Sequence, residues 1–272
     1  MPRLDFEARD RDGVLKKYGY LDMEAGEEEE PAKMTFYGDI VSSEAWGADR
    51  EPQQIVDFLS ELPENKQVNL YFNSPGGDAF AGVAMYNILN RWKGKRVGYV
   101  EAIAASAATM PLMACDEIHL ETGAEIMIHD PWTWTAGNAA YLRDCADRLE
   151  KVGDHYADIY AKKAAEGVTR EELRQAMTAE TWIDSSNAAR YFDIITDGGE
   201  AAAPAASVFY KKYKAVPQHV LDALKAQEAA RMAAQSAERV TAKNDQAKAA
   251  DAAEERQSRA QALLCDLYLY GT

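Results

Sequence analysis

The sequence predicts an α/β fold, because strand patterns alternate with helical patterns through the middle of the chain. Short apolar runs bounded by turn residues are typical of buried strands, and apolar residues at gaps of three and four are typical of helices. Such alternation indicates an α/β core with right-handed crossovers. We expect strands over 68–72, 97–103, 117–120 and 124–128, and helices over 79–92 and directly after Ser106.

The residues ahead of this core predict a hairpin, a strand and a helix. An Asp-Gly dipeptide at 12–13 lies between two short runs and favours a hairpin turn. Residues 1–33 are therefore expected to form a loose arm or hairpin. A first core strand is expected over 34–37 and 40–41, and helical spacing of apolar residues predicts a helix over 52–62.

A long helix is expected over 138–165, where apolar residues recur at gaps of three and four. Such a seam can pack on its own domain or on a helix of a second subunit, and the sequence leaves both open. The later elements are a helix over 170–177 preceded by a Thr-x-x-Glu capping box, a short helix over 185–191 and a strand over 194–196. The seam comprises Leu142, Cys145, Leu149, Val152, Tyr156 and Ile159.

Changes in composition divide the chain into four parts. The arm over 1–33 precedes a core domain over 34–199, and an Ala/Pro-containing linker follows over 200–216. Residues 217–272 are rich in Ala, Gln, Glu, Lys and Arg, which favours helix. Because this part has few apolar residues in its middle, we expect a helical extension that leans on a partner or is only partly ordered.

Charge and cysteine content exclude several classes of function. The net charge of −15 lies mostly on the residues before 217, and such an acidic body disfavours binding to nucleic acid or anionic membranes. No apolar run approaches the roughly 18 residues of a membrane span, and no secretory signal is expected. Three cysteines without metal-ligand spacing suit a reducing cytoplasm, so no metal is expected.

Ser106 is the first candidate for chemistry. It stands where an apolar strand pattern changes to a tract of small residues, which predicts a serine beside the unpaired N–H groups of a helix start. The small neighbours Ala104, Ala105, Ala107 and Ala108 would let an extended substrate backbone come close. The alternative is that Ser106 only caps a helix, so partner residues must decide.

Four motifs in order supply those partners. They are NSPGG at 73–77, AIAASAAT at 102–109, MIHDP at 127–131 and the tripeptide ETW at 180–182. Together they resemble the ClpP family of serine peptidases over roughly residues 34–197. The resemblance implies the ClpP/crotonase superhelix of repeated ββα units, with the long helix in the place of the family's handle helix.

The resemblance also assigns roles, residue by residue. Ser106 would be the nucleophile and His129 the general base, while the backbone N–H groups of Gly77 and Ala107 would form the oxyanion hole. The chemistry agrees, because a serine hydroxyl needs a neutral imidazole to remove its proton. A glycine at 77 also lets its N–H point at the oxyanion with no Cβ in the way.

The acid of the triad is less sharply indicated. The family usually has an aspartate two residues before the aromatic residue of its last motif, and this chain has Glu180 there, ahead of Trp182. Asp184 and Asp193 are rivals, and a Ser-His dyad is a further alternative. Trp132 and Trp134 could line a substrate groove or pack on the long helix, and packing is the interpretation we adopt.

The helical extension favours one branch of the family. Housekeeping members usually end near the strand over 194–196, whereas an acidic arm and an Ala/Gln-rich extension resemble the ClpP-related head-maturation proteases of tailed phages and prophages. That resemblance implies scaffold and capsid precursors as protein substrates, a homo-oligomeric ring, and a location in the bacterial cytoplasm or the prohead. No cofactor is expected, and no Walker-type phosphate loop is present in the sequence.

Two other functions remain open at this point. A structural or scaffolding subunit with a decayed triad would keep the fold and lose catalysis, and Glu180 with the extension would be its support. A crotonase-type acyl-CoA enzyme shares the core and the oxyanion turn, but that group does not require a serine and a histidine at these positions.

Overall fold

The computed structural model describes residues 3–9, 12–41, 53–207, 209–237 and 239. The chain divides into two compact units, Met1–Leu221 and Asp222–Thr272. The first unit contains every candidate residue of the site. It is wider than the expected catalytic domain, because it takes in the N-terminal hairpin and the segment that the composition marks as a linker.

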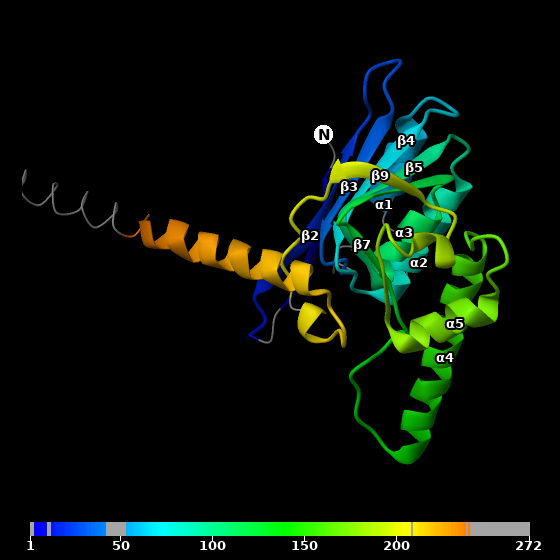
Figure 1. Cartoon of the computed structure of the whole chain (residues 1–272), viewed down its shortest axis with the longest axis vertical. Coiled ribbons are helices and arrows are strands. Elements are labelled where there is room, and N and C mark those ends of the chain that lie inside the picture. The colour runs from blue at the N-terminus through cyan, green and yellow to red at the C-terminus, as the bar shows by residue number, and fades with distance from the viewer. Residues whose placement is uncertain (1–2, 10–11, 42–52, 208, 238, 240–272) are drawn as a thin grey trace, which may run out of the picture. The chain divides into compact units, whose positions relative to one another are not determined.

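One sheet organises the first unit and confirms the α/β class (Figure 1). Its main path runs β1-β2-β3-β4-β5-β6-β9, with parallel pairing from β3 through β9, and β7 pairs with β5 and β8. In the described residues the strands are β1 (Arg3–Arg9), β2 (Leu15–Glu24), β3 (Ala32–Gly38), β4 (Val68–Ser74), β5 (Arg96–Ala105), β6 (Glu117–Thr122), β7 (Glu125–Ile128), β8 (Thr181–Ile183) and β9 (Ile195–Glu200).

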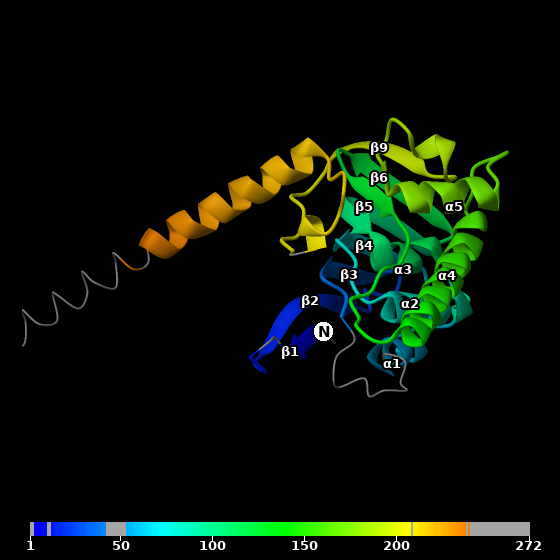
Figure 2. The ribbon, with the colours of Figure 1, turned by 90° about the horizontal axis from the view of Figure 1, so that it is seen from below.

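Helices cover one side of this sheet (Figure 2). Helix α2 follows the turn after β4, and a single 3₁₀ turn with α3 follows β5, which is the expected order. The expected helix over 185–191 is only a 3₁₀ turn at Ala188–Arg190. The α-helices are α1 (Gln53–Glu61), α2 (Ala79–Arg91), α3 (Thr109–Met113), α4 (Ala139–Ala161) and α5 (Arg170–Ala179), and the other 3₁₀ turns are Ser106–Ala108 and Phe209–Lys211.

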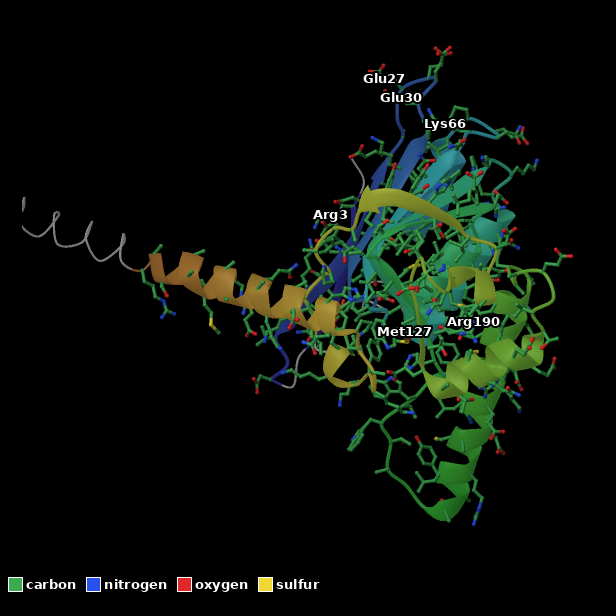
Figure 3. The ribbon with its side chains drawn as sticks, in the orientation of Figure 1. Arg3, Glu27, Glu30, Lys66, Met127 and Arg190 are labelled. Atoms are coloured by element: carbon green, nitrogen blue, oxygen red, sulfur yellow. The ribbon has the colours of Figure 1, made fainter. Side chains whose placement is uncertain are left out.

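Of the two forms expected for residues 1–33, the hairpin is the one present, and it packs on the core. Strand β2 pairs antiparallel with β3, so the hairpin extends the main sheet. Lys66, labelled beside Glu27 and Glu30 in Figure 3, donates from Nζ to the carbonyl oxygen of Glu27 at 2.6 Å and ties the β2–β3 turn to the residues before β4. Alternate side chains of the hairpin are buried, namely Leu4, Phe6, Leu21 and Met23.

The centre of the core lies where β3, β4 and β5 pair. Phe36 and Phe72 are fully buried and stack with ring centroids 4.9 Å apart. The expected extra strand segment over 40–41 is reduced to a bridge between Ile40 and Gly77. This bridge joins the end of β3 to the glycine turn after β4, and so fixes the turn from the side opposite β5.

Helix α4 packs on its own domain through its C-terminal half only. Asn138 caps its start by accepting a hydrogen bond from the N–H of Tyr141 at 3.0 Å. In the N-terminal half the seam residue Leu142 is 44% exposed. The buried residues of the helix all lie in its second half: Gly153, Tyr156, Ala157, Ile159 and Tyr160.

The C-terminal extension begins as a helix over 218–237. The base of this helix lies in the first unit, where His219 Nε2 is 3.4 Å from the buried carboxylate of Glu125 on β7. The apolar residues expected to close the extension lie outside the described residues. Within the described residues, no helix has both the length and the hydropathy needed to cross a bilayer.

Glu125 is expected to make stability depend on pH. Burial raises the pKa of its carboxyl from 4.5 to about 8, and the charge of Asp184 adds to the shift. The folded chain therefore holds a proton that the unfolded chain has released. The stability from protonated Glu125 is fully present below about pH 4.5 and is lost as the pH rises through about 8.

Relative to Glu125→Gln, the wild type should lose at most about 1.4 kcal/mol of unfolding free energy per pH unit over this window. Urea unfolding at a series of pH values measures this difference. The exposed Glu64→Gln change serves as the matched control and should follow the wild type. Parallel curves for the wild type and Glu125→Gln would show that the buried carboxyl is not protonated in the folded chain.

Candidate active site

The turn that begins at Ser106, here called the Ser106 turn, stands at the end of β5. Ser106 has a φ of 53°, in the left-handed region, and begins the 3₁₀ turn that leads into α3. Thr109 holds the turn from inside, because its hydroxyl donates to the carbonyl oxygen of Ser106 at 2.5 Å and lies 2.6 Å from the Tyr160 hydroxyl. A residue held in this uncommon conformation is typical of a functional turn.

His129 reaches Ser106 from β7, the strand that pairs with the end of β5. Its Nε2 lies 2.7 Å from Ser106 Oγ, a hydrogen-bond distance. The next residue is fixed on both sides, because the N–H of Asp130 donates to the Met177 carbonyl at 3.1 Å and its carboxylate pairs with Arg174. The loop after β7 is therefore anchored to α5, and the imidazole is held in place.

The surroundings of His129 favour a neutral imidazole. Burial lowers the pKa of His129 below its ordinary value, and the charges of Glu180 and Asp130 oppose that shift in part. A neutral ring at neutral pH can accept the Ser106 proton, which is the protonation state that a general base requires.

Glu180 is brought next to His129 by strand pairing. Ile128 pairs with Thr181 across the antiparallel β7–β8 ladder, so the residues that follow and precede them lie side by side. Glu180 is buried, with a left-handed φ of 55° at the end of α5. Its charge acts on the His129 pKa, while its Oε1 accepts hydrogen bonds from the backbone N–H groups of Lys214 and Ala215 at 2.5 and 3.0 Å.

The two rival carboxylates have other surroundings. Asp184 accepts hydrogen bonds from the N–H groups of Ser186 and Asn187 and from the Ser186 hydroxyl, so it caps a local turn. Asp193 is exposed. Among the three acidic residues, Glu180 is the one whose charge acts on His129.

The glycine turn lies between the end of β3 and the Ser106 turn. A Cβ built on Gly77, whose φ is 146°, would lie 1.9 Å from the carbonyl oxygen of Ile40. A Cβ on Gly76 would lie 2.8 Å from Ser106 Cβ and 3.0 Å from the backbone nitrogen of Ala107. Both glycines are therefore needed for the close approach of the expected oxyanion residues, Gly77 and Ala107, to Ser106.

Gly77→Ala is expected to lower kcat by about 10²- to 10³-fold, the cost of a misplaced oxyanion donor. The added methyl must push the turn away from the Ile40 backbone, which moves the N–H of residue 77. Peptidase kinetics and thermal unfolding on the same sample measure both consequences. Gly198→Ala is the control, because a Cβ there meets nothing within 4 Å. A Gly77→Ala protein with unchanged kcat would remove residue 77 from the oxyanion hole.

A cavity of about 660 Å³ opens beside the Ser-His pair. Gly77, Ser106 and His129 line it on one side, and seam residues of α4 line another. Trp132 and Trp134 also line it. Trp134 is 91% exposed, so the expectation that it packs on the long helix is wrong. The seam residues on its wall are Cys145, Leu149, Val152 and Tyr156.

Sequence reasoning missed three residues around the site. Tyr213 lines the cavity and meets His129 edge-on with centroids 5.4 Å apart, and Phe209 lines the cavity too. Both stand in the segment expected to be a linker. Gly76 was passed over in favour of its neighbour. The aromatic residues in an otherwise small and polar linker were the one signal in the sequence that could have drawn attention to that segment.

The chain was compared with known protein families and proteins. A family model described as Clp protease matches residues 43–196. The ATP-dependent Clp protease proteolytic subunit of Borreliella afzelii is 29% identical over 136 residues, which cover 49% of this chain and 68% of the relative. The ATP-dependent Clp protease proteolytic subunit 3 of Streptomyces avermitilis is 29% identical over 161 residues, which cover 58% and 71%.

A solved structure supports the fold. A ClpP1 mutant from Listeria monocytogenes superposes with a TM-score of 0.50 at 19% identity, covering 61% of this chain and 91% of that chain. The expected ClpP-like fold is thereby confirmed. The family model spans more than half of the chain and includes Gly77, Ser106, His129 and Glu180. The chain therefore belongs to the Clp protease family.

Proposed function

We propose that this chain is a serine endopeptidase in which Ser106 is the nucleophile, His129 the general base and Glu180 the acid. The observation that carries the proposal is the 2.7 Å contact between Ser106 Oγ and His129 Nε2, at the wall of an open cavity. Membership of the Clp protease family and the lowered pKa of His129 support it.

The reaction follows from the positions of these groups. His129 takes the Ser106 proton as Oγ attacks the carbonyl carbon of the substrate, and the N–H groups of Gly77 and Ala107 stabilise the oxyanion. His129 then gives the proton to the departing amine, which leaves an acyl group on Ser106. Water enters and loses a proton to His129 as its oxygen attacks the acyl carbon. His129 then returns that proton to Ser106 Oγ as the bond from Oγ to the acyl carbon breaks, which releases the acyl group as a carboxylic acid that ionises. Glu180 stabilises the imidazolium that forms twice in this cycle.

We further propose that its substrates are scaffold and capsid precursor proteins of a phage or prophage, cleaved during prohead maturation by a homo-oligomer. The helical extension after β9 supports this branch of the family. The exposed N-terminal half of α4, where Tyr141 is 47% and Leu142 44% exposed, supports a contact between subunits of a ring.

Co-expression with candidate scaffold and capsid proteins tests the substrate class. Intact-mass spectrometry of the wild-type products should show discrete cleavage of a precursor, and Ser106→Ala should leave the precursor whole. Cleavage of a general substrate such as casein without cleavage of any precursor would contradict the phage assignment. Precursor assembly that does not change with Ser106→Ala, without any proteolysis, would favour a catalytically decayed scaffolding subunit instead.

A further inference from the structure

The segment after β9 turns back across the molecule to the active site. We call residues 202–215 the strap; all of them except Val208 are described. In Figure 1 this yellow segment returns from β9 to the end of the sheet where β7 ends. The carboxamide of Asn73, just before the glycine turn, holds its first part at two points. Nδ2 donates to the carbonyl of Ala203 at 2.9 Å, and Oδ1 accepts from the N–H of Ala205 at 2.7 Å.

The far end of the strap lies on the catalytic pair itself. Tyr213 is buried, its ring meets His129 edge-on, and its hydroxyl donates to the carbonyl oxygen of Pro75 in the glycine turn. Burial raises the pKa of the Tyr213 phenol, and the nearby Ser106 side chain opposes that shift. Tyr213 therefore lies beside the base and the glycine turn, on the wall of the cavity that Ser106 and His129 also line.

The strap also engages the acid. The N–H groups of Lys214 and Ala215 both donate to Glu180 Oε1. Hydrogen bonds from backbone N–H groups to a carboxylate stabilise its charged form and fix its position. While the strap is in place, the Glu180 carboxylate accepts hydrogen bonds from these two N–H groups and also acts through its charge on His129.

A substrate that reaches Ser106 must pass Tyr213, which lines the same cavity. Its carbonyl carbon must approach Ser106 Oγ while its carbonyl oxygen reaches the N–H groups of the oxyanion hole. Tyr213, whose hydroxyl donates to the Pro75 carbonyl and whose ring meets His129, stands on that approach. Ala202, Ala203, Ala206 and most residues from Lys211 to Ala215 are exposed, and the strap is held through its buried residues Pro204, Ala205, Tyr210 and Tyr213. Exposed stretches between a few anchors open at a lower free-energy cost than the sheet beneath them.

We propose that the strap is an intramolecular occupant of the active site, which keeps polypeptide substrates from Ser106 until it is displaced. Displacement removes Tyr213 from the nucleophile and frees Glu180 to act on His129 alone. This inference rests on the proposed function, because it assigns a closed state to the same site. It predicts that the full chain is a slow peptidase whose rate is set by the fraction of molecules with an open strap.

The rate of Ser106 labelling by a small fluorophosphonate tests the proposal. Tyr213→Ala removes the strap side chain that lies beside the catalytic pair. Labelling of Ser106 should therefore be about tenfold or more faster than in the wild type. Lys211→Ala, on the exposed side of the same segment, should match the wild type, and Ser106→Ala should not be labelled. Equal rates in the wild type and Tyr213→Ala would overturn the strap while leaving the peptidase intact. A slower rate in Tyr213→Ala would also overturn it and make Tyr213 a positioning residue for His129.

Loss of labelling in both the wild type and Tyr213→Ala would instead overturn the proposed function on which the strap depends.

A second measurement needs no variant that could fail to fold. Hydrogen exchange of the wild-type chain should show protected amides at Lys214 and Ala215. Alkylation of His129 by a peptidyl chloromethyl ketone should abolish that protection. Unchanged protection in the alkylated protein would show that a bound peptide and the strap coexist, which contradicts the proposal.

Discussion

Replacing Ser106 by alanine is expected to lower kcat for peptide cleavage by about 10⁶-fold, the loss measured when a serine nucleophile is removed from its triad. The hydroxyl oxygen is the atom that becomes bonded to the substrate. In the first step of the proposed cycle, this hydroxyl is also the group that gives its proton to His129. The fold should not change, because the backbone turn at Ser106 is held by Thr109 and Tyr160 rather than by the hydroxyl. Peptidase kinetics and thermal unfolding of the same preparation measure both statements.

Ser60→Ala is the matched control for this change. Ser60 is an exposed serine on α1 whose hydroxyl donates to the Asp57 carbonyl, remote in the chain from the site. It should keep wild-type kcat. A Ser106→Ala protein that retained a tenth or more of wild-type activity would show that the hydrolysis arises elsewhere.

Changing Glu180 to glutamine is expected to lower kcat by about 10⁴-fold, as when the acid of a serine peptidase triad loses its charge but keeps its shape. Glutamine still accepts hydrogen bonds from Lys214 and Ala215, so the change isolates the negative charge. The carboxylate raises the pKa of His129 against the effect of burial. Without it the pKa of the imidazole should fall further, and the proton transfer from Ser106 should be less favourable.

Asp184→Asn is the companion variant, because Asp184 caps a turn instead of acting on His129. Its kcat should stay within about threefold of the wild type, and its main effect should be on stability. A large loss of kcat in Asp184→Asn together with full activity in Glu180→Gln would make Asp184, and not Glu180, the acid of the triad. Full activity in both would leave Ser106 and His129 as a dyad.

The parts of this fold that sequence predicted best depend on local chemistry. The capping box before α5 is present as expected, with Thr169 and Glu172 bonded to each other's backbone N–H groups. The alternation of β4, α2, β5 and α3 follows from periodicity within short windows. The pairing of Ser106 with His129 was predicted from ordered motifs, and it arises because Ser106 and His129 follow β5 and β7, two strands that pair in this sheet.

The parts that sequence predicted poorly depend on contacts between distant residues. The hairpin has the alternating burial of a sheet strand, but nothing within residues 1–33 says that β3 is its neighbour. The strap is the sharper case. Ala205 bonds to Asn73, a residue 132 positions away, and small residues in the segment are typical of a linker wherever they occur. Its role becomes visible only once Tyr213 is placed beside His129.

The most direct test of the central claim is the pH dependence of Ser106 labelling by a fluorophosphonate, with the adduct located by mass spectrometry. The account predicts one adduct on Ser106, formed at a rate that rises with pH. The midpoint should lie below 6.5, the ordinary pKa of histidine, because burial lowers the pKa of His129. His129→Ala should form this adduct at least about 10³-fold more slowly. Labelling of His129→Ala at the wild-type rate, or an adduct on another residue, would contradict the account.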